Sequence, residues 1–354
     1  MKHVMKIKAL LLMLIIGSAL IMGSCKDKDK DEPIVEGDKT ELLALITQAE
    51  AIANAATAED YPQSAIDEFK ATLQTIKEAV ETKLTQTEID NMIVQLTAAM
   101  EKFNEQAYGY IDENLYLTAG WHFDEGTGNT ATAFSTVAHI ATFFRGSTAV
   151  LGDEAMMPSW VDGVKGKAVY FNKGAHLEVP YTTAFLPADI TISVWVKPDE
   201  LYEHNYIVSQ NYWNGYKLQT QGGGKPFFTY KKTDGGIIDA DNETDNSVKA
   251  GQWNHIVVSV NKTSKELKFY VDGTLTKTWT ESDKGIGPLL QDLEDPQPFI
   301  IGGVATDAEL EANFMEWTTA ENLGYFKGAI DELKIYNIAL SDGQVSKLYN
   351  DEKP

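Results

Sequence analysis

Cysteine is almost absent from the 354-residue sequence, which contains only Cys25. A single thiol excludes an intramolecular disulfide and any zinc site built on several cysteines. The six histidines are scattered and include no His-Glu-x-x-His pair of the kind that binds catalytic zinc. With 43% hydrophobic residues, the chain is nevertheless apolar enough to bury a core.

Basic residues are also scarce. The chain has 30 of them, Arg145 being the only arginine, against 52 acidic residues, so its formal net charge is −22. A charge of this sign and size repels the phosphate backbones of DNA and RNA. Nucleic acid is therefore excluded as an expected partner.

Residues 1–24 have the composition of a signal peptide. Three lysines precede an apolar run over residues 9–22, and small residues follow it. Cys25 comes directly after, in the sequence IMGSC, which resembles the lipobox of bacterial lipoproteins with Met22 in place of the usual leucine. The resemblance implies cleavage before Cys25 and lipidation of its thiol. A transmembrane anchor and a secretory signal with an incidental cysteine are the alternatives.

Residues 25–39 are predicted to form a flexible tether, because the stretch KDKDKDEP has no apolar face to bury. Its acidic residues beside the cysteine resemble the export signal of surface lipoproteins in Bacteroidetes. The resemblance implies a protein of the outer membrane, exposed on the cell surface and touching the membrane only through its lipid. The periplasmic face of that membrane is the alternative.

Residues 40–107 have helical periodicity. Three apolar stripes, each repeating every three or four positions, predict three amphipathic helices packed as a bundle. Pro62 stands at the break between the first two helices, and Thr85 with Glu88 forms a capping-box sequence before the third. The stretch LTQTEIDNMIVQLTAAMEKF resembles the FIVAR module of bacterial surface proteins. We interpret this domain as a spacer.

Between residues 108 and 354 the apolar period changes to two. In residues 190–197, apolar residues alternate with Thr191, Ser193, Trp195 and Lys197, which is typical of a strand. Further strands are predicted over residues 168–171, 255–260, 265–270, 299–301 and 330–336, with a hairpin turn at Asp272-Gly273. Many short strands with little helical pattern predict an all-β sandwich or barrel.

Seven blocks of this region occur in the order found in laminin G-like, concanavalin A-like jelly rolls. They are GWHFDEGTGNTA, GVKGKAVYFNKGAHLEVP, DITISVWVKPDE, YIVSQNYWNGYKLQT, GQWNHIVVSVN, LKFYVDGTL and FKGAIDELKIYNIALSDGQVSKLY. The resemblance implies a mainly-β sandwich preceded by the small three-helix bundle, and a recognition function most often directed at glycans. It also places Trp121, Trp195, Trp253 and Tyr336 in the framework, where core positions are expected.

The sequence has no local signature of an active site. A glycoside hydrolase on such a sandwich needs two carboxylates on one strand face, as in Glu-x-Asp-x-x-Glu. Glu88 and Asp90 begin this spacing but belong to the helical domain, and the adjacent Asp331 and Glu332 are expected to point to opposite faces of their strand. We therefore predict that the protein is not an enzyme.

A structural calcium ion is implied by the resemblance. Laminin G-like domains often hold calcium through an acid of the FDEG block and the aspartate of the IDE block, which correspond to Asp124 and Asp331. Oxygen ligands suit this ion. Asp331 is expected to share a strand face with Leu333 and Ile335, so its charge needs a partner. In the alternative, that partner is a set of backbone N–H groups and no metal binds.

Exposed aromatic rings are the expected glycan-binding groups, because their faces stack on the C–H side of a sugar. Two segments contain such rings beside amide and carboxylate side chains. Tyr202, Tyr212 and Trp213 belong to the first, and Trp317 belongs to a long connection between strands. The alternative is that these rings only pack the loops against the sandwich.

Three functions remain compatible with the sequence. The first is a lipid-anchored surface protein that captures a polysaccharide without cleaving it. The second is an adhesion or assembly component whose sandwich contacts a protein, for which other surface uptake proteins are the expected partners. The third is a glycoside hydrolase whose carboxylates come from separate strands.

Overall fold

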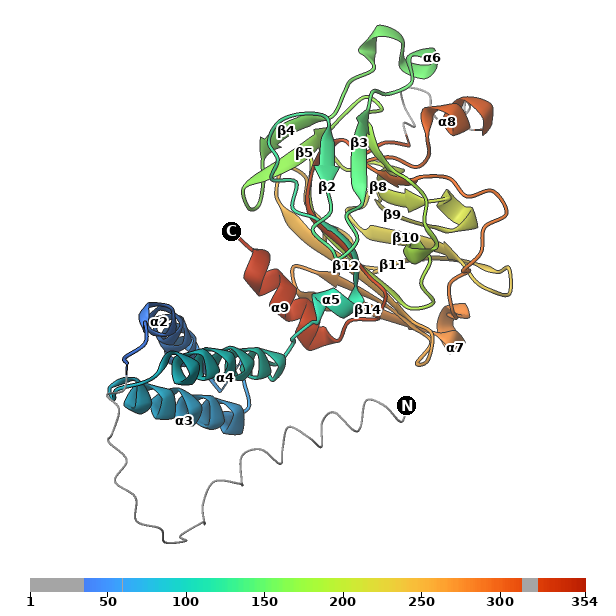
Figure 1. The fold of residues 1–354 in the computed structure, drawn as a ribbon. Coiled ribbons are helices and arrows are strands. Elements are labelled where there is room, and N and C mark those ends of the chain that lie inside the picture. Colours follow the sequence, from blue (N-terminus) through green and yellow to red (C-terminus); the bar gives the residue numbers. More distant parts are fainter. Residues whose placement is uncertain (1–34, 59, 314–323) are drawn as a thin grey trace, which may run out of the picture.

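The computed structural model describes residues 35–58, 60–313 and 324–354. A bundle of three helices is followed by a sandwich of two antiparallel β-sheets, with the bundle at lower left in Figure 1. The predicted fold class is therefore confirmed. Among the described residues, no helix is both long enough and apolar enough to span a membrane.

The bundle contains α2 (Thr40–Ala55), α3 (Gln63–Val80) and α4 (Gln86–Glu105). Each helix buries its predicted apolar stripe in one common core. Pro62 occupies the N-cap position of α3, at the break between the helices that the sequence predicts. The capping box before α4 is formed, because the Thr85 side chain accepts the Glu88 N–H and the Glu88 carboxylate accepts the Thr85 N–H.

The strands of the first sheet are β1 (Leu117–Trp121), β4 (Ser159–Asp162), β5 (Lys167–Phe171), β7 (Ile190–Pro198), β12 (Asn254–Asn261), β13 (Glu266–Val271), β14 (Thr274–Thr280) and β16 (Gly328–Tyr336). Their order is β14-β13-β12-β7-β16-β5-β4, and β1 pairs with β16. The hairpin from β13 to β14 turns at Asp272 and Gly273, whose φ values of +48° and +71° match the predicted two-residue turn.

The strands of the second sheet are β2 (Thr130–Thr132), β3 (Ile140–Phe144), β6 (His176–Val179), β8 (Asn205–Gln210), β9 (Tyr216–Thr220), β10 (Pro226–Lys231), β11 (Ile237–Asp241) and β15 (Phe299–Ile301). Their order is β11-β10-β9-β8-β15-β6-β3-β2. Short helices connect the strands: α5 (Glu113–Tyr116), α6 (Thr148–Leu151), η1 (Gly152–Glu154), η2 (Thr183–Phe185), η3 (Tyr212–Asn214), α7 (Glu281–Lys284), α8 (Asp307–Asn313) and, near the C-terminus, the longer α9 (Asp342–Glu352).

The main core lies between the two sheets and has aromatic rings at its centre. Phe299 of the second sheet stacks on Phe185 with ring centroids 4.9 Å apart, and Trp121 of the first sheet lies 6.3 Å from Phe299. All three are fully or almost fully buried. Trp121 and Tyr336 are thus buried as expected, whereas Trp253 is only half-buried.

Strand β16 contains a bulge that changes which side chains share a face. Its pairing with β7 shifts register between Asp331 and Lys334, and Glu332 has a φ of +45°. Leu333 and Ile335 pack in the main core, whereas Asp331 and Glu332 bond to groups outside it. The expectations that Asp331 shares a face with Leu333 and that Asp331 and Glu332 oppose each other are therefore wrong.

Helix α9 covers the outer face of the first sheet, on the side of the sandwich nearest the bundle (Figure 1). Its Val345 and Leu348 pack with Tyr270 and Tyr336 in a separate small core. The chain leaves the bundle through Gly109, where a Cβ would lie 2.6 Å from the Gly343 carbonyl oxygen of α9. With its φ of +83° as well, this position requires glycine.

Replacing Phe299 by Ala should lower the free energy of unfolding of the sandwich by about 3–5 kcal/mol, because a stacked ring is removed from a packed core. The exposed control Val137→Ala should change it by less than about 0.5 kcal/mol. Denaturant titration followed by tryptophan fluorescence measures both values. Equal effects of the two substitutions would contradict this placement of Phe299.

Candidate functional site

The outer face of the second sheet carries two rows of side chains that run across strands β8 to β11. They exist because alternate residues of β9, β10 and β11 point into the core and the intervening ones point away from it, whereas in β8 a register shift places both Ile207 and Val208 in the core. One row is Tyr206, Gln219, Phe227 and Asp241, and the other is Ser209, Lys217, Thr229 and Asp239. Aromatic and polar side chains therefore lie next to one another on this face.

All residues of these rows except Ser209 and Asp241 line the floor of a groove of about 370 Å³. The segment before β8, with Glu203 and His204, and the short helix η3, with Trp213, provide its walls. The lining residues are Glu203, His204, Tyr206, Trp213, Lys217, Gln219, Gln221, Phe227, Thr229, Ile237 and Asp239. We call this cavity the sheet groove.

Hydrogen bonds hold the polar side chains of the sheet groove in place. Thr229 Oγ1 donates to Asp239 Oδ1 at 2.5 Å, and Lys217 Nζ donates to Gln219 Oε1 at 2.8 Å. Burial lowers the pKa of Lys217 to about 8, and it also lowers the pKa of His204. The groove thus contains prepositioned donors and acceptors beside aromatic surface.

The structure separates the aromatic residues that the sequence singled out. Trp213 lines the sheet groove, and the Tyr212 ring lies 4.7 Å from it while its hydroxyl donates to Glu309 at 2.7 Å. Tyr202 is not among the residues that line the groove. Its hydroxyl donates to the Tyr325 carbonyl oxygen at 2.7 Å. Trp317 and the predicted lipidation site Cys25 lie outside the described residues.

The two predicted calcium ligands hold the same turn between β4 and β5. Asp331 Oδ2 accepts the N–H groups of Val164 and Lys165 at 2.8 and 3.3 Å, and Asp124 Oδ1 accepts the Lys167 N–H at 2.7 Å. Asp331 Oδ1 accepts the N–H of Glu332 at 2.8 Å. Burial raises the pKa of Asp331 to about 7 despite these donors.

N–H donors around both Asp331 oxygens suit a carboxylate and oppose a cation at the same atoms. Within residues 35–58, 60–313 and 324–354, no cluster of three or more His, Cys, Asp or Glu side chains could hold a metal ion. The N–H contacts at Asp331 are those of the hydrogen-bonding alternative. Calcium binding itself is left to the chelation experiment below.

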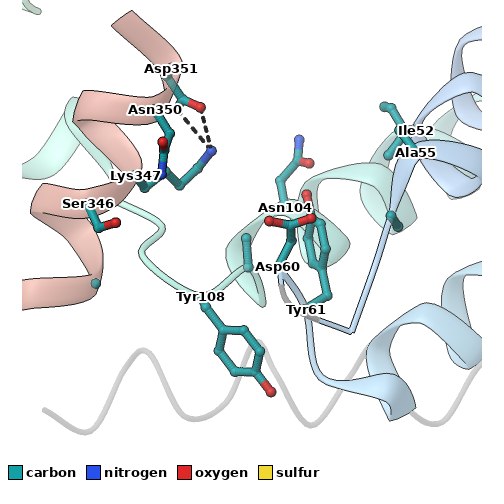
Figure 2. Close-up of a pocket in the computed structure, with 13 residues that line it drawn as sticks. Ile52, Ala55, Asp60, Tyr61, Asn104, Tyr108, Ser346, Lys347, Asn350 and Asp351 are labelled. Carbon is teal, nitrogen blue, oxygen red and sulfur yellow. Dashed lines mark hydrogen bonds and ion pairs between the residues drawn. The ribbon is translucent and has the colours of Figure 1, made fainter. Parts of the chain in front are cut away.

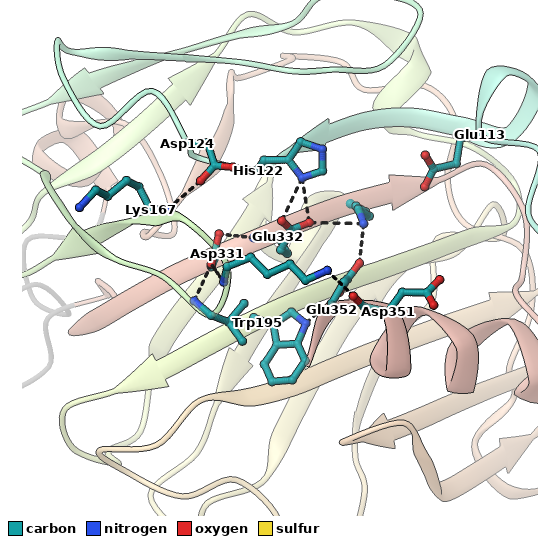
Figure 3. Close-up of polar contacts among 12 residues, drawn as sticks. Glu113, His122, Asp124, Lys167, Trp195, Asp331, Glu332, Asp351 and Glu352 are labelled. Carbon is teal, nitrogen blue, oxygen red and sulfur yellow. Dashed lines mark hydrogen bonds and ion pairs between the residues drawn. The ribbon is translucent and has the colours of Figure 1, made fainter. Parts of the chain in front are cut away.

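Beneath α9, charged side chains form a buried network on the outer face of the first sheet (Figure 3). Lys334 pairs with Glu352 of α9 and lies 3.4 Å from Glu332, whose carboxylate also bonds His122 Nδ1 at 2.9 Å. Trp195 Nε1 donates to Glu352 at 2.8 Å. Glu332 holds the pKa of His122 above its usual value, and the network ties the C-terminal helix to the sheet.

Ser193 and His255 resemble a nucleophile and its base but have no access to substrate. Ser193 Oγ lies 2.8 Å from His255 Nε2, and both residues are fully buried. Burial lowers the pKa of His255 to about 3, so the ring is neutral at pH 7. This pair belongs to the packing beneath α9.

A second cavity, of about 530 Å³, lies between the bundle and α9 (Figure 2). Tyr61, Asp60 and Asn104 line its bundle side, and Lys347 and Asp351 of α9 line the other. Lys347 and Asp351 bond each other at 2.9 Å. This interdomain cleft is larger than the sheet groove, but its α9 cation is already paired.

Sequence reasoning missed most of the sheet groove. Of its lining residues only Trp213 was a candidate, because glycan-binding rings were expected in loops and not on the strands beneath them. The available signal was the alternation of Lys217 and Gln219 with buried Tyr216 and Leu218, which predicts a polar outer face. The pairing of β9 with β8 and β10 decides which other side chains lie on the same face.

Comparison with known families and structures gives the following matches. Residues 171–346 match the family Laminin_G_3, described as the concanavalin A-like lectin/glucanases superfamily. No curated protein matches the chain. Domain 4 of an extracellular arabinanase from Geobacillus stearothermophilus, solved with arabinotriose, is 22% identical with a TM-score of 0.44; the alignment covers 66% of this chain and 98% of that one.

Two further solved structures have lower identity. The carbohydrate-binding domain of a Ruminococcus gnavus sialidase, bound to alpha2,3 sialyllactose, is 18% identical over 54% of this chain and 92% of its own, with a TM-score of 0.37. The binding domain of botulinum neurotoxin DC is 11% identical over 66% of this chain, with a TM-score of 0.45. The match spans 51%, about half, of that toxin domain.

Chelation with EDTA should leave the melting temperature unchanged, because backbone N–H groups already compensate Asp331. Differential scanning calorimetry with and without added calcium tests this expectation. A calcium-dependent rise in melting temperature that disappears in Asp124→Ala would instead establish the metal site.

Glu352→Ala should destabilise the sandwich by about 3–5 kcal/mol, because the substitution leaves Lys334 buried without its main partner. Adding Lys334→Met should recover part of that loss, since an apolar chain needs no counter-ion. Thermal and chemical unfolding of the two single variants and the double variant measure the coupling. Additive effects would contradict a buried ion pair.

Proposed function

We propose that this concanavalin A-like sandwich binds a glycan in the sheet groove without cleaving it. The observation that carries the proposal is the alternation of aromatic and polar side chains across strands β8 to β11. The likeness of residues 171–346 to the lectin and glucanase superfamily is consistent with it.

The chemistry of the sheet groove suits a sugar ring. The half-buried aromatic side chains of Trp213 and Phe227 offer surface for the C–H face of a pyranose or furanose, while Tyr206 is buried beneath the groove. Gln221 and Asp239 offer an amide and a carboxylate to hydroxyl groups. A volume of about 370 Å³ falls within the ordinary range for small-molecule sites and corresponds to a short oligosaccharide segment.

Binding without hydrolysis is supported by the hydrogen bonds that the carboxylates of the groove already accept from the protein. A glycoside hydrolase requires two carboxyl groups free to flank the scissile bond. Asp239 accepts a short hydrogen bond from Thr229, and Glu203 accepts the Gly222 N–H at 3.2 Å. If the protein were a hydrolase, these two residues would be its carboxylate pair, and released reducing ends would reveal it.

A protein partner is the alternative, and exposed apolar side chains on another part of the second sheet favour it. Ile140 and Phe144 of β3 are 50% and 40% exposed, and the neighbouring Met156 and Met157 are also exposed. Such residues near the edge strand β2 would suit a contact in an adhesion or uptake assembly.

Attachment to the outer membrane completes the proposal. Lipidation of Cys25, a charged tether and a helical spacer would hold the sandwich at the cell surface. The open sheet face would then meet large glycans outside the cell. Removal of the three signal-peptide lysines would change the net charge from −22 to 27 − 52 = −25, which agrees with a mutually repelling surface on the anchored protein.

Trp213→Ala and Phe227→Ala should each weaken glycan binding about tenfold or more, since each removes stacking surface from the groove. A glycan array with residues 33–354 identifies the ligand, and calorimetry measures the affinities. Phe144→Ala, an exposed aromatic of the same sheet outside the groove, is the matched control. No glycan bound by folded protein, or equal losses in all three variants, would contradict the proposal.

A further inference from the structure

Lys217 is a buried cation in the floor of the sheet groove that lacks a counter-ion. The residue is only 7% exposed. Among the described residues, no carboxylate comes within ion-pair distance of its Nζ, and its hydrogen bond goes to the neutral amide of Gln219. Lys334, which is also buried to this degree among the described residues, contacts two carboxylates, Glu332 and Glu352.

Aromatic rings provide partial compensation. Lys217 Nζ lies 5.2 Å from the ring centroid of Tyr206 and 5.2 Å from that of Phe227, on either side. Cation–π contacts of this kind are worth about 0.5–2 kcal/mol, which is less than the several kcal/mol that burial of an ammonium costs. An ammonium has three N–H donors, and the structure uses one of them.

Several titratable groups face the same cavity. Asp239 comes from β11 and Tyr206 from β8, while Glu203 and His204 lie on the segment before β8. The field of Asp239 raises the pKa of Lys217, but burial outweighs it and lowers that pKa to about 8. The ammonium form therefore predominates at pH 7, at the cost of an unpaired charge.

We propose that Lys217 pairs with an anionic group on the bound glycan, a carboxylate or a sulfate ester. The inference rests on the proposed function and names its ligand class: a sugar chain that contains acidic residues. An anion at Nζ would use the remaining N–H donors and provide the missing counter-charge. The neighbouring rings and amides would hold the rest of the sugar.

The overall charge of the protein limits how acidic this glycan can be. At −22, the protein repels a polyanion that approaches from solution. A contact with one buried ammonium is short-ranged and screened little by salt. We therefore expect a chain with isolated acidic sugars among neutral ones, and not a uniformly charged polymer.

Calorimetry on the whole protein without its first 32 residues tests the proposal with matched probes. The probes are a neutral oligosaccharide that the protein binds, the same chain carrying one uronic acid, and the same chain carrying one sulfate ester. We expect at least about tenfold tighter binding of a charged member. Comparing the two charged members distinguishes carboxylate from sulfate.

Three variants identify the residue responsible. Lys217→Gln should abolish the preference for the acidic chain while keeping affinity for the neutral one, and Lys217→Arg should retain the preference. Lys197→Gln, which removes a lysine exposed on the first sheet, is the control for net charge and should change nothing. Melting temperatures establish that each variant is folded.

The pH profile of the unmodified protein provides a test that needs no variant. The preference should be full at pH 7 and decline as the pH rises above about 8, because deprotonation of Lys217 removes the positive charge. A bound anion raises the pKa of Lys217, so the decline should begin above the value of the free protein. His204 and Tyr206 do not interfere in this range, since burial lowers the pKa of the first and raises that of the second.

The outcomes separate this inference from the proposed function. Equal affinity for neutral and acidic chains, or a preference unaffected by Lys217→Gln, would overturn the inference and leave glycan binding intact. Failure to bind any glycan would overturn both. A preference lost in Lys217→Gln and with rising pH would establish Lys217 as the anion-binding residue.

Discussion

Face-to-face packing of the two sheets is the interaction on which the rest of this structure depends. The stacked rings of Phe185 and Phe299, with Trp121 across from them, bury the inner face of both sheets. Because strand side chains alternate, committing one face of each sheet to this core commits the other face to the outside. The outer faces of the two sheets then differ in what covers them.

The outer face of the first sheet is closed by the C-terminal helix. Apolar residues of α9 and the buried charges of Glu352 and Lys334 cover it, so even the close Ser193 and His255 pair has no solvent access. The bulge in β16 contributes to this closure, because it turns Asp331 and Glu332 together toward the outer side. There they hold the β4–β5 turn and the network beneath α9 instead of forming a site.

The outer face of the second sheet contains the sheet groove across β8 to β11, and this groove makes it the candidate site. Its side chains differ from an ordinary solvated surface in one respect, which is that Lys217 is buried without a counter-ion. A folded domain tolerates such a charge at a cost in stability, and a ligand of opposite charge would recover that cost. The uncompensated charge of Lys217 is therefore the feature of the fold from which we propose an anionic class of ligand.

Local sequence was informative wherever the structure depends on neighbours along the chain. Apolar residues that repeat every three or four positions, together with the Thr85 capping box, predicted the bundle. Apolar residues at every second position predicted the strands, and Asp272-Gly273 predicted a hairpin. The same reasoning placed Trp213 in a turn, where it lines the sheet groove and also packs, half-buried, against a small core. Each of these signals is a local preference that operates within a few residues.

Only the tertiary structure decided which distant residues meet. The register of β8 to β11 brings Lys217, Thr229 and Asp239 into one row, and no spacing in the sequence contains that information. The bulge in β16 reversed the expected face of Asp331, because one extra residue changes the phase of a strand. The sequence by itself therefore determined the elements and the fold class, while strand pairing and the docking of α9 decided which sheet face is covered by a helix and which carries the groove.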